Sequence, residues 1–368
     1  MKTIGIICNL MTSYGGVQTC VISLIKGLNQ QGIIPTLLSD NIPKKELWEE
    51  HGLHCNIHKV NFSISAESFD KSKKILMPIW EFVFYFKTSW LDEEFDFIYI
   101  FQPNVMINNN QKHLFYLSMS PRAYNFSKTP FLTNVKNIFY KTFLKKIHPI
   151  FEFQNYNCVI NSNYTAKMFY DYYGKKLDVV YPSNAVEKYI PDEINKKEKT
   201  VVFLSRLAPG KRVEKVVDLA KNYEDYTFYI IGAINNKNIS YLKNIKKLIE
   251  TYRLNNIEIL VNQPYSNVMG YLSLSEYYVF FAENEHFGIT TVEAMLFGCI
   301  PFVHNSGGQK EIVSENKLRF DNENMLIKFN DLININKLEK QILKNILDDE
   351  VSEFKEEVFI NKMLAYID

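Results

Sequence analysis

Two carboxylates, Glu285 and Glu293, lie eight positions apart around the segment EHFGITTVE. This spacing runs across a loop and into a helix, so the two side chains need not share one helical face. They are therefore suited to holding two different parts of a long ligand. Gly288 ends the loop where a helix is expected to open near Thr291, and the free N–H groups of a helix start favour an anion. The pattern predicts a site for an extended anionic ligand.

The same residues also fit structural interpretations. Thr290 and Glu293 have the spacing of a helix capping box, and Gly298 fits an ordinary helix stop. Glu285 taken alone fits a solvated loop acid. The loop Ser306-Gly307-Gly308 follows one strand later. This combination favours a ligand site, because ligands bind at the carboxyl ends of parallel strands in βαβ units.

Basic residues and glycines form two further candidate phosphate sites. Arg206 and Lys211 lie on the loop after an expected strand, 200–204. An arginine offers a fork to phosphate oxygens, and a lysine offers a point charge. Gly15 and Gly16 precede the first expected helix, where the lack of side chains lets backbone amides approach a phosphate. The simpler alternatives are a basic surface loop and an ordinary tight turn.

Alternating strands and helices must position these residues. Apolar runs of strand length are separated by segments of helical periodicity, which predicts βα units and parallel sheets. Expected strands are 3–8, 35–39, 97–102, 158–161, 200–204, 227–232, 257–261 and 278–282. Expected helices include 17–30, 240–252, 267–274 and one from about 291 to 298. A length of 368 residues suits two such domains.

Composition bounds the class of protein. The formal net charge of +1 argues against a general nucleic-acid binder, and 46% hydrophobic with 23% charged residues is ordinary for a soluble globular protein. The five cysteines are scattered without a C-x-x-C pair, which favours reduced thiols in the cytoplasm. The start runs into the strand-like TIGIIC, and the most apolar segment, 75–90, contains Glu81 and Lys87. We expect no signal peptide and no membrane-spanning helix.

Potential metal ligands cluster in EEHGLHCNIHKV, which contains His51, His54, Cys55 and His58. Apolar and polar residues alternate through this segment, which favours a strand. A strand would send His54 and His58 to one face and Cys55 to the other. We therefore expect no metal site here or elsewhere in the chain.

A long stretch without acidic residues follows the strand expected at 97–102. Up to residue 151 it contains no Asp or Glu, and its segment 135–147 has apolar residues at helical spacing. The basic residues of the stretch are Lys112, Arg122, Lys128, Lys136, Lys141, Lys145 and Lys146. Two interpretations remain open: a basic helix within 122–147 that docks on an anionic membrane surface, or a helix packed on its own domain. The missing acids favour the first, which would make a cytoplasmic protein peripheral to the inner face of a membrane.

Three phrases carry a family resemblance. The spelling EHFGI, VEAM, GCIP and SGG over 285–308 resembles the E-x7-E signature of retaining glycosyltransferases of family 4, and is especially similar to that family's mannosyltransferases acting on lipid-linked oligosaccharides. SRLAPGK at 205–211 resembles the family's donor-diphosphate motif, with Ser205 in place of the usual glycine. Gly15 and Gly16 match the Gly-Gly loop that opens these enzymes. The resemblance covers most of the chain.

The resemblance implies an α/β protein of the GT-B fold, with two facing Rossmann-like domains. Residues 1–183 would form the acceptor domain and 184–347 the nucleotide-sugar donor domain, with a C-terminal helix at 348–368 crossing back. The implied activity is retaining, metal-independent transfer of a hexose (mannose, glucose or N-acetylglucosamine) from a GDP- or UDP-linked donor to a glycan or polyprenyl-linked acceptor. The sequence contains no D-x-D metal motif, and no cofactor is implied.

The resemblance also implies residue roles. Glu293 would hold the nucleotide ribose and Glu285 the donor-sugar hydroxyls, while Arg206 and Lys211 would neutralise the leaving diphosphate. The implied catalytic residues are therefore Glu285, Arg206 and Lys211. The implied donor-binding residues are Gly15, Gly16, Phe287, Gly288, Ile289, Thr290, Glu293, Ser306, Gly307 and Gly308.

One departure concerns the acceptor side. Many family members place a histidine in the N-domain loop that here reads LSMSPR at 117–122, so the residue that contacts the acceptor hydroxyl stays open. Two other classes also stay open. A sugar-nucleotide epimerase shares the architecture but is not expected to combine E-x7-E with SGG. A catalytically silent nucleotide-sugar-binding scaffold is disfavoured by the intact Glu285, Arg206 and Lys211.

Overall fold

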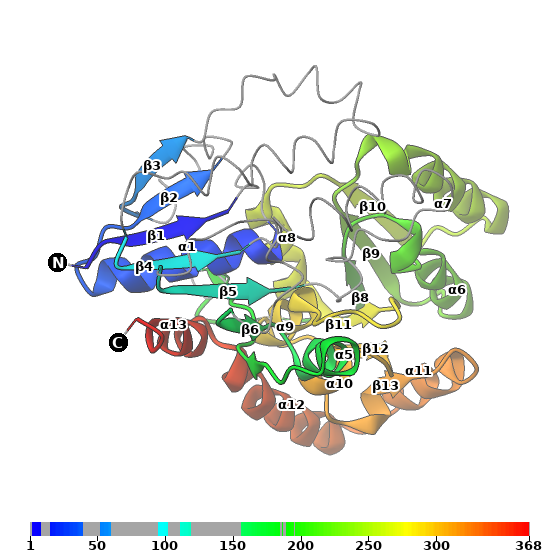
Figure 1. The fold of residues 1–368 in the computed structure, drawn as a ribbon. Helices are drawn as coiled ribbons and strands as arrows, with labels where there is room; N and C mark the ends of the chain where they lie inside the picture. Colours follow the sequence, from blue (N-terminus) through cyan, green and yellow to red (C-terminus); the bar gives the residue numbers. More distant parts are fainter. Residues whose placement is uncertain are drawn as a thin grey trace. The chain divides into compact units, whose positions relative to one another are not determined.

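The structure is a computed structural model (Figure 1), and it describes residues 2–8, 15–39, 52–59, 95–101, 111–118, 156–184, 186, 189–194 and 196–367. The chain forms two compact units. The first combines Met1–Ser183 with Glu357–Asp368, and the second is Asn184–Glu356. No helix among these described residues is both long and apolar enough to cross a membrane. The segment 122–147, where a membrane-docking helix is expected, lies outside them.

The first unit contains a parallel sheet in the order β3-β2-β1-β4-β5-β6-β7. Its central strands are short apolar runs buried on both faces, which is the pattern of a parallel sheet covered by helices. The strands are β1 (Ile4–Ile7), β2 (Thr36–Ser39), β3 (Asn56–Lys59), β4 (Phe97–Ile100), β5 (His113–Leu117), β6 (Cys158–Ile160) and β7 (Asp178–Val179). The described helices are α1 (Gly16–Gln30), α5 (Asn163–Tyr173) and most of α13 (Glu356–Leu364).

The end of the chain packs into the core of this first unit. Ile360 and Met363 of α13 lie in the same buried cluster as the apolar face of α1. A Cβ atom on Gly27 of α1 would overlap the Ile360 side chain, so the helices meet where a side chain is missing. The Tyr99 hydroxyl donates to the Met363 carbonyl at 2.8 Å, and Lys2 Nζ donates to the Ile367 carbonyl at 2.8 Å.

The second unit contains a parallel sheet in the order β10-β9-β8-β11-β12-β13. Counted within the unit this order is 3-2-1-4-5-6, that of a doubly wound Rossmann fold. The strands are β8 (Lys197–Leu204), β9 (Thr227–Gly232), β10 (Ile257–Val261), β11 (Ser275–Phe280), β12 (Ile300–His304) and β13 (Arg319–Phe320). The helices are α6 (Glu214–Asn222), α7 (Ile239–Tyr252), α8 (Tyr265–Leu274), α9 (Ile289–Leu296), α10 (Gln309–Ile312), α11 (Met325–Ile333) and α12 (Lys337–Val351).

Most expected elements are present, with shifted ends. Strand β11 begins at Ser275 rather than 278, and α8 begins at Tyr265 rather than 267. The histidine- and cysteine-containing segment does enter a strand, β3, but His54 and Cys55 precede it. The C-terminal helix expected at 348–368 is divided between the end of α12 and α13, because the chain turns through the 3-10 segment Ser352–Phe354. Residues 348–356, expected in the returning tail, group with the second unit.

Candidate functional site

The second unit has a topological switch point between β8 and β11. These neighbouring strands are parallel, and their chain connections run to opposite sides of the sheet, toward β9 and β12. The loops at their carboxyl ends therefore emerge side by side, which is where ligands bind in doubly wound sheets. The β8 loop carries Arg206 and Lys211, and the β11 loop carries Glu285. The switch point thus gathers residues that lie far apart in the sequence.

Lys211 and Glu285 meet across this switch point. The Lys211 ammonium donates to Glu285 Oε2, and their side chains are 16% and 22% exposed. Lys211 Nζ also lies 5.2 Å from the centre of the Phe280 ring. A partly buried cation and a carboxylate are therefore held together at the carboxyl ends of the central strands β8 and β11. Each can exchange its partner for a ligand group of the same charge type.

The helix after Glu285 starts differently from expectation. Helix α9 begins at Ile289, its N-cap is Gly288 with φ of 116°, and no side chain caps it. The capping-box interpretation of Thr290 and Glu293 is therefore wrong, because Glu293 lies more than a turn inside the helix. The Thr290 hydroxyl is instead hydrogen-bonded to the Tyr278 hydroxyl at 2.7 Å. The Thr291 N–H donates to the Gly288 carbonyl at 2.9 Å, which leaves the N–H groups of Ile289 and Thr290 without a partner within the helix and suited to an anion.

Glu293 is buried, with 6% of its surface exposed. The Tyr265 hydroxyl donates to Glu293 Oε1 at 3.1 Å. Loss of solvation raises the pKa of Glu293 to about 7, although the Tyr265 hydrogen bond acts in the opposite direction. Burying a carboxyl with one neutral donor costs folding free energy, and carboxyls with such raised pKa values cluster at functional sites.

This raised pKa makes stability depend on pH. A carboxyl whose folded pKa exceeds its unfolded value stabilises the fold through its bound proton. That contribution is complete below about 4.5 and is lost as the pH rises through about 7. Between about pH 5 and pH 8 we expect the free energy of unfolding of the wild type to fall by about 2 kcal/mol relative to that of Glu293→Gln, and its Tm to fall accordingly. Calorimetry of both proteins across this range checks it; parallel profiles would contradict it.

Two glycines allow the β11 and β12 loops to touch. A Cβ atom on Gly307, whose φ is 66°, would overlap the Glu285 backbone. A Cβ atom on Gly308 would overlap the backbone of His286 and Phe287, and the Gly308 N–H donates to the Glu285 carbonyl at 2.8 Å. These glycines therefore set the position of the Glu285 backbone.

Gln309 contacts the first turn of α9 and its N-cap. Its side chain is fully buried, and its Oε1 accepts from the Thr291 hydroxyl at 2.8 Å. A Cβ atom on Gly288 would overlap Gln309 Nε2, so only glycine fits at the N-cap. The buried Nε2 donor has no hydrogen-bond partner among the described residues. The N-cap is thus packed against a polar group rather than an apolar one.

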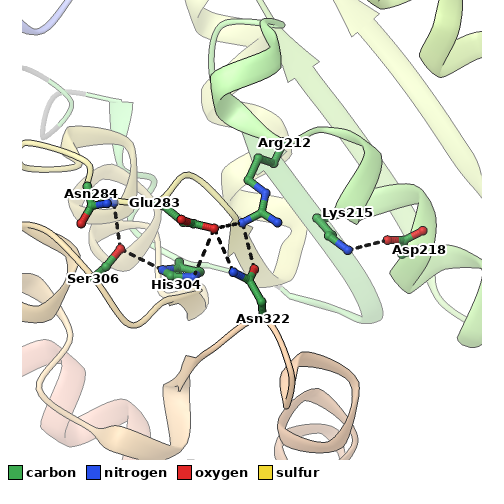
Figure 2. A network of polar contacts seen from close by, with 8 residues as sticks. All are labelled: Arg212, Lys215, Asp218, Glu283, Asn284, His304, Ser306 and Asn322. Atoms are coloured by element: carbon green, nitrogen blue, oxygen red, sulfur yellow. Dashed lines mark hydrogen bonds and ion pairs between the residues drawn. The ribbon is translucent and has the colours of Figure 1, made fainter.

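A second polar network, shown in Figure 2, includes Arg212 and Asn284, the chain neighbours of Lys211 and Glu285. Arg212 Nη1 donates to Glu283 Oε1 and, at 2.9 Å, to Asn322 Oδ1. Asn322 Nδ2 also donates to Glu283 Oε1, at 2.9 Å. Sequence reasoning missed these residues. The available signal was that Glu283 directly follows an expected strand and Arg212 directly follows Lys211. Asn322 follows the edge strand β13, and only the fold brings it to Glu283.

The remaining predicted residues are placed as follows. Arg206 is exposed and has no hydrogen-bond or ion-pair partner within the part of the chain that the structure describes. Phe287 is buried, and its ring lies 5.6 Å from that of Phe354, so it packs rather than lines an opening. Gly15 caps α1 in extended conformation and belongs with Gly16 to the first unit. No three His, Cys, Asp or Glu side chains of the described residues are grouped to hold a metal.

Comparison with known proteins connects this site to a family. The family model described as "Glycosyl transferases group 1" matches residues 187–357. The chain is 26% identical over 201 residues to the human GDP-Man:Man(3)GlcNAc(2)-PP-Dol alpha-1,2-mannosyltransferase, covering 50% of this chain and 41% of that protein. It is 25% identical over 197 residues to alpha-1,3/1,6-mannosyltransferase alg2 of Schizosaccharomyces pombe, covering 43% and 39%. The matches thus span less than half the length of these curated relatives.

Solved structures are similar over the whole chain. Sucrose-phosphate synthase from Thermosynechococcus elongatus has a TM-score of 0.72 at 14% identity, covering 99% of this chain and 98% of that one. HepE of Anabaena, in complex with UDP and glucose, has a TM-score of 0.66 at 16% identity, covering 99% of both chains. At these identities the likeness shows the fold. The GT-B fold expected from the sequence resemblance is confirmed.

Proposed function

We propose that this chain, whose residues 187–357 match the glycosyl transferases group 1 family, is a retaining, metal-independent hexosyltransferase. Its donor is a nucleotide diphosphate sugar, and its acceptor is a glycan or a lipid-linked glycan. The observation that carries the proposal is the Lys211–Glu285 pair at the switch point of the second unit. It sets a cation for a diphosphate beside a carboxylate for sugar hydroxyls.

The roles follow from charge and placement. Lys211, with the exposed Arg206 on the same loop, neutralises the diphosphate, and the free N–H groups at the start of α9 bind its oxygens. Glu285 accepts hydrogen bonds from the sugar hydroxyls. Glu293 accepts from the ribose hydroxyls, which gives the charged form of the buried carboxyl donors in addition to the Tyr265 hydroxyl.

The chemical step needs no cofactor. The bond between the anomeric carbon and the leaving phosphate oxygen breaks, and a bond forms from that carbon to the acceptor oxygen on the same face. The acceptor's hydroxyl proton passes to the leaving phosphate. Negative charge grows on the diphosphate as its bond breaks, so the ammonium of Lys211 stabilises the transition state more than the bound donor.

The names of the relatives favour one donor. The curated relatives are named as mannosyltransferases, and the printed donor of the human protein is GDP-Man with a dolichol-linked acceptor. We therefore propose GDP-mannose as donor and a polyprenyl-linked glycan as acceptor, with a UDP-linked hexose as the competing donor. HepE, which was solved with UDP and glucose, motivates that competitor.

A thermal-shift comparison followed by turnover tests the proposal. A ligand at a hundred times its Kd stabilises a protein by about 2.7 kcal/mol. We expect GDP-mannose to raise Tm more than UDP-glucose or UDP-N-acetylglucosamine, and GDP to be released only when an acceptor is present. Stabilisation without turnover on any acceptor would favour a silent scaffold. Conversion of the nucleotide sugar without acceptor would favour the epimerase, which no named relative supports.

We further propose peripheral membrane contact through 122–147. Each Lys near an anionic surface contributes about 1 kcal/mol, screened by salt. Changing Lys141, Lys145 and Lys146 together to Glu should release the protein from vesicles that contain phosphatidylserine, while donor binding stays unchanged. Co-sedimentation at low and high salt measures this. A wild type that ignores anionic vesicles at low salt would instead indicate a packed helix and a soluble acceptor.

A further inference from the structure

Arg212 links three loops of the second unit through one side chain (Figure 2). It follows Lys211 on the β8 loop, pairs with Glu283 of the β11 loop, and donates to Asn322 beyond β13 at 2.9 Å. Asn322 in turn donates to the same Glu283 oxygen. Glu283 therefore accepts from two side chains that lie on different loops. The hydrogen bond from Asn322 and then the Arg212 charge hold the pKa of Glu283 below its ordinary value.

A second branch reaches the backbone next to Glu285. The Asn284 N–H donates to Ser306 Oγ at 2.8 Å, and Ser306 Oγ is 2.8 Å from His304 Nδ1. His304 Nε2 lies 3.9 Å from Glu283 Oε1. With the proton of His304 on Nε2, facing Glu283, the Ser306 hydroxyl donates to Nδ1 while it accepts from Asn284. His304 Nε2 makes no hydrogen bond among the described residues, so its 3.9 Å approach to Glu283 Oε1 is an electrostatic contact that connects the side chain at 283 with the hydrogen-bonded backbone at 284.

Two residues of this network have left-handed backbone. The φ angles are 55° for Arg212 and 53° for Asn284. Such conformations are uncommon outside glycine, and asparagine tolerates them better than arginine. Both residues directly adjoin the charged pair, since Arg212 follows Lys211 and Asn284 precedes Glu285. Backbone strain in the residues that adjoin Lys211 and Glu285 indicates that these residues fix the position of the pair.

We propose that Arg212 and Glu283 are positioning residues, which fix the β8 and β11 loops so that Lys211 and Glu285 meet. The inference rests on the proposed function for its consequence in catalysis. Neither residue needs to touch the donor. Within the described part of the chain, their side-chain contacts are with each other, Asn322 and His304, and not with Glu285 or Lys211. Removing them leaves the catalytic side chains present but misplaced.

The magnitudes separate this role from a contribution to stability. The Arg212 and Glu283 side chains are 24% and 42% exposed, and exposed ion pairs contribute little to folding. A misplacement of about 1 Å, by contrast, can lower a rate about 100-fold. Arg212→Ala and Glu283→Ala should therefore lower kcat about 10- to 100-fold, with Tm shifted by less than about 4 °C. The KM for GDP-mannose should change less than kcat.

A conservative variant and a matched control sharpen the kinetics. Glu283→Gln keeps the oxygen that accepts from Arg212 and Asn322, so it should keep most of the rate that Glu283→Ala loses. Lys215→Ala removes a nearby cation that pairs with Asp218 at 3.0 Å outside the network, and should leave kcat within twofold of the wild type. A purely structural role would move Tm together with kcat and show no such rescue.

A second readout does not require turnover. Limiting acetic anhydride labels exposed, uncharged amines, and mass spectrometry reports the rate at Lys211. In the wild type the Glu285 contact protects Lys211; we expect labelling to rise severalfold in Arg212→Ala and Glu283→Ala, toward the level in Glu285→Ala. Lys215→Ala should leave Lys211 labelling unchanged.

The two readouts distinguish the possible failures. Faster Lys211 labelling in a protein without transferase activity supports the positioning role and overturns the proposed function. Unchanged labelling in both alanine variants overturns the positioning role, whatever the activity. Equal losses in Glu283→Gln and Glu283→Ala also contradict it, because the accepting oxygen would then not matter.

Discussion

Replacing Lys211 with alanine is expected to lower kcat about 10²–10³-fold, the usual cost of removing one preorganised donor from a charged transition state. The structure strengthens this expectation relative to Arg206. Lys211 is only 16% exposed and already paired with Glu285, whereas Arg206 is exposed. A held cation needs no reorganisation when charge develops, so Lys211→Ala should cost more than Arg206→Ala. Steady-state kinetics with saturating donor measure both.

The control for this prediction lies four residues later, in α6. Lys215→Ala removes the same charge and should leave kcat nearly unchanged. Folding should survive in Lys211→Ala, because Lys211 lies in the segment between β8 and α6, and the Glu285 side chain is 22% exposed and can be solvated without its partner. A kcat within threefold of the wild type would remove Lys211 from the proposed mechanism. Arginine at this position is not an equivalent replacement, because its planar fork differs from a point charge.

Replacing Glu293 with glutamine is expected to weaken nucleotide binding roughly 10- to 150-fold. A hydrogen bond to a charged group contributes about 1.5–3 kcal/mol, and glutamine retains the shape and the Tyr265 contact but not the charge. The variant should fold normally near neutral pH, since the buried site already favours an uncharged group. Calorimetric titration with GDP measures the loss.

Glu285→Gln provides the contrast. The Glu285 side chain pairs with Lys211 and is partly exposed, unlike the buried Glu293. The Glu285→Gln substitution should therefore lower kcat more than it weakens GDP binding. Unchanged GDP affinity in Glu293→Gln would show that the buried carboxyl serves only packing with Tyr265. Similar affinity losses in both variants would contradict the separate roles of the two glutamates.

Much of the second unit followed from local pattern. Apolar runs such as TFYIIG at β9 and the periodic apolar face of α7 lie where periodicity predicted them. The E-x7-E spacing and the SGG loop also pointed to two loops that the structure brings into contact. The ends of the helices were less well predicted, because the position of a helix's first turn depends on its cap. Gly288 caps α9 through a backbone angle and close contact with Gln309, which leave no signature in side-chain spacing.

The amino-acid sequence by itself determined the βα repeat, the two-domain size and the candidate residues Glu285, Glu293 and Lys211. Only the tertiary structure decided which of them meet. Strand β11 enters the sheet beside β8 although two βα units separate them in the chain, and this order joins Lys211 to Glu285 and Arg212 to Glu283. It also buried Glu293 while leaving Arg206 exposed. Side-chain types and periodicity are local properties, whereas strand order and desolvation depend on how the whole unit packs.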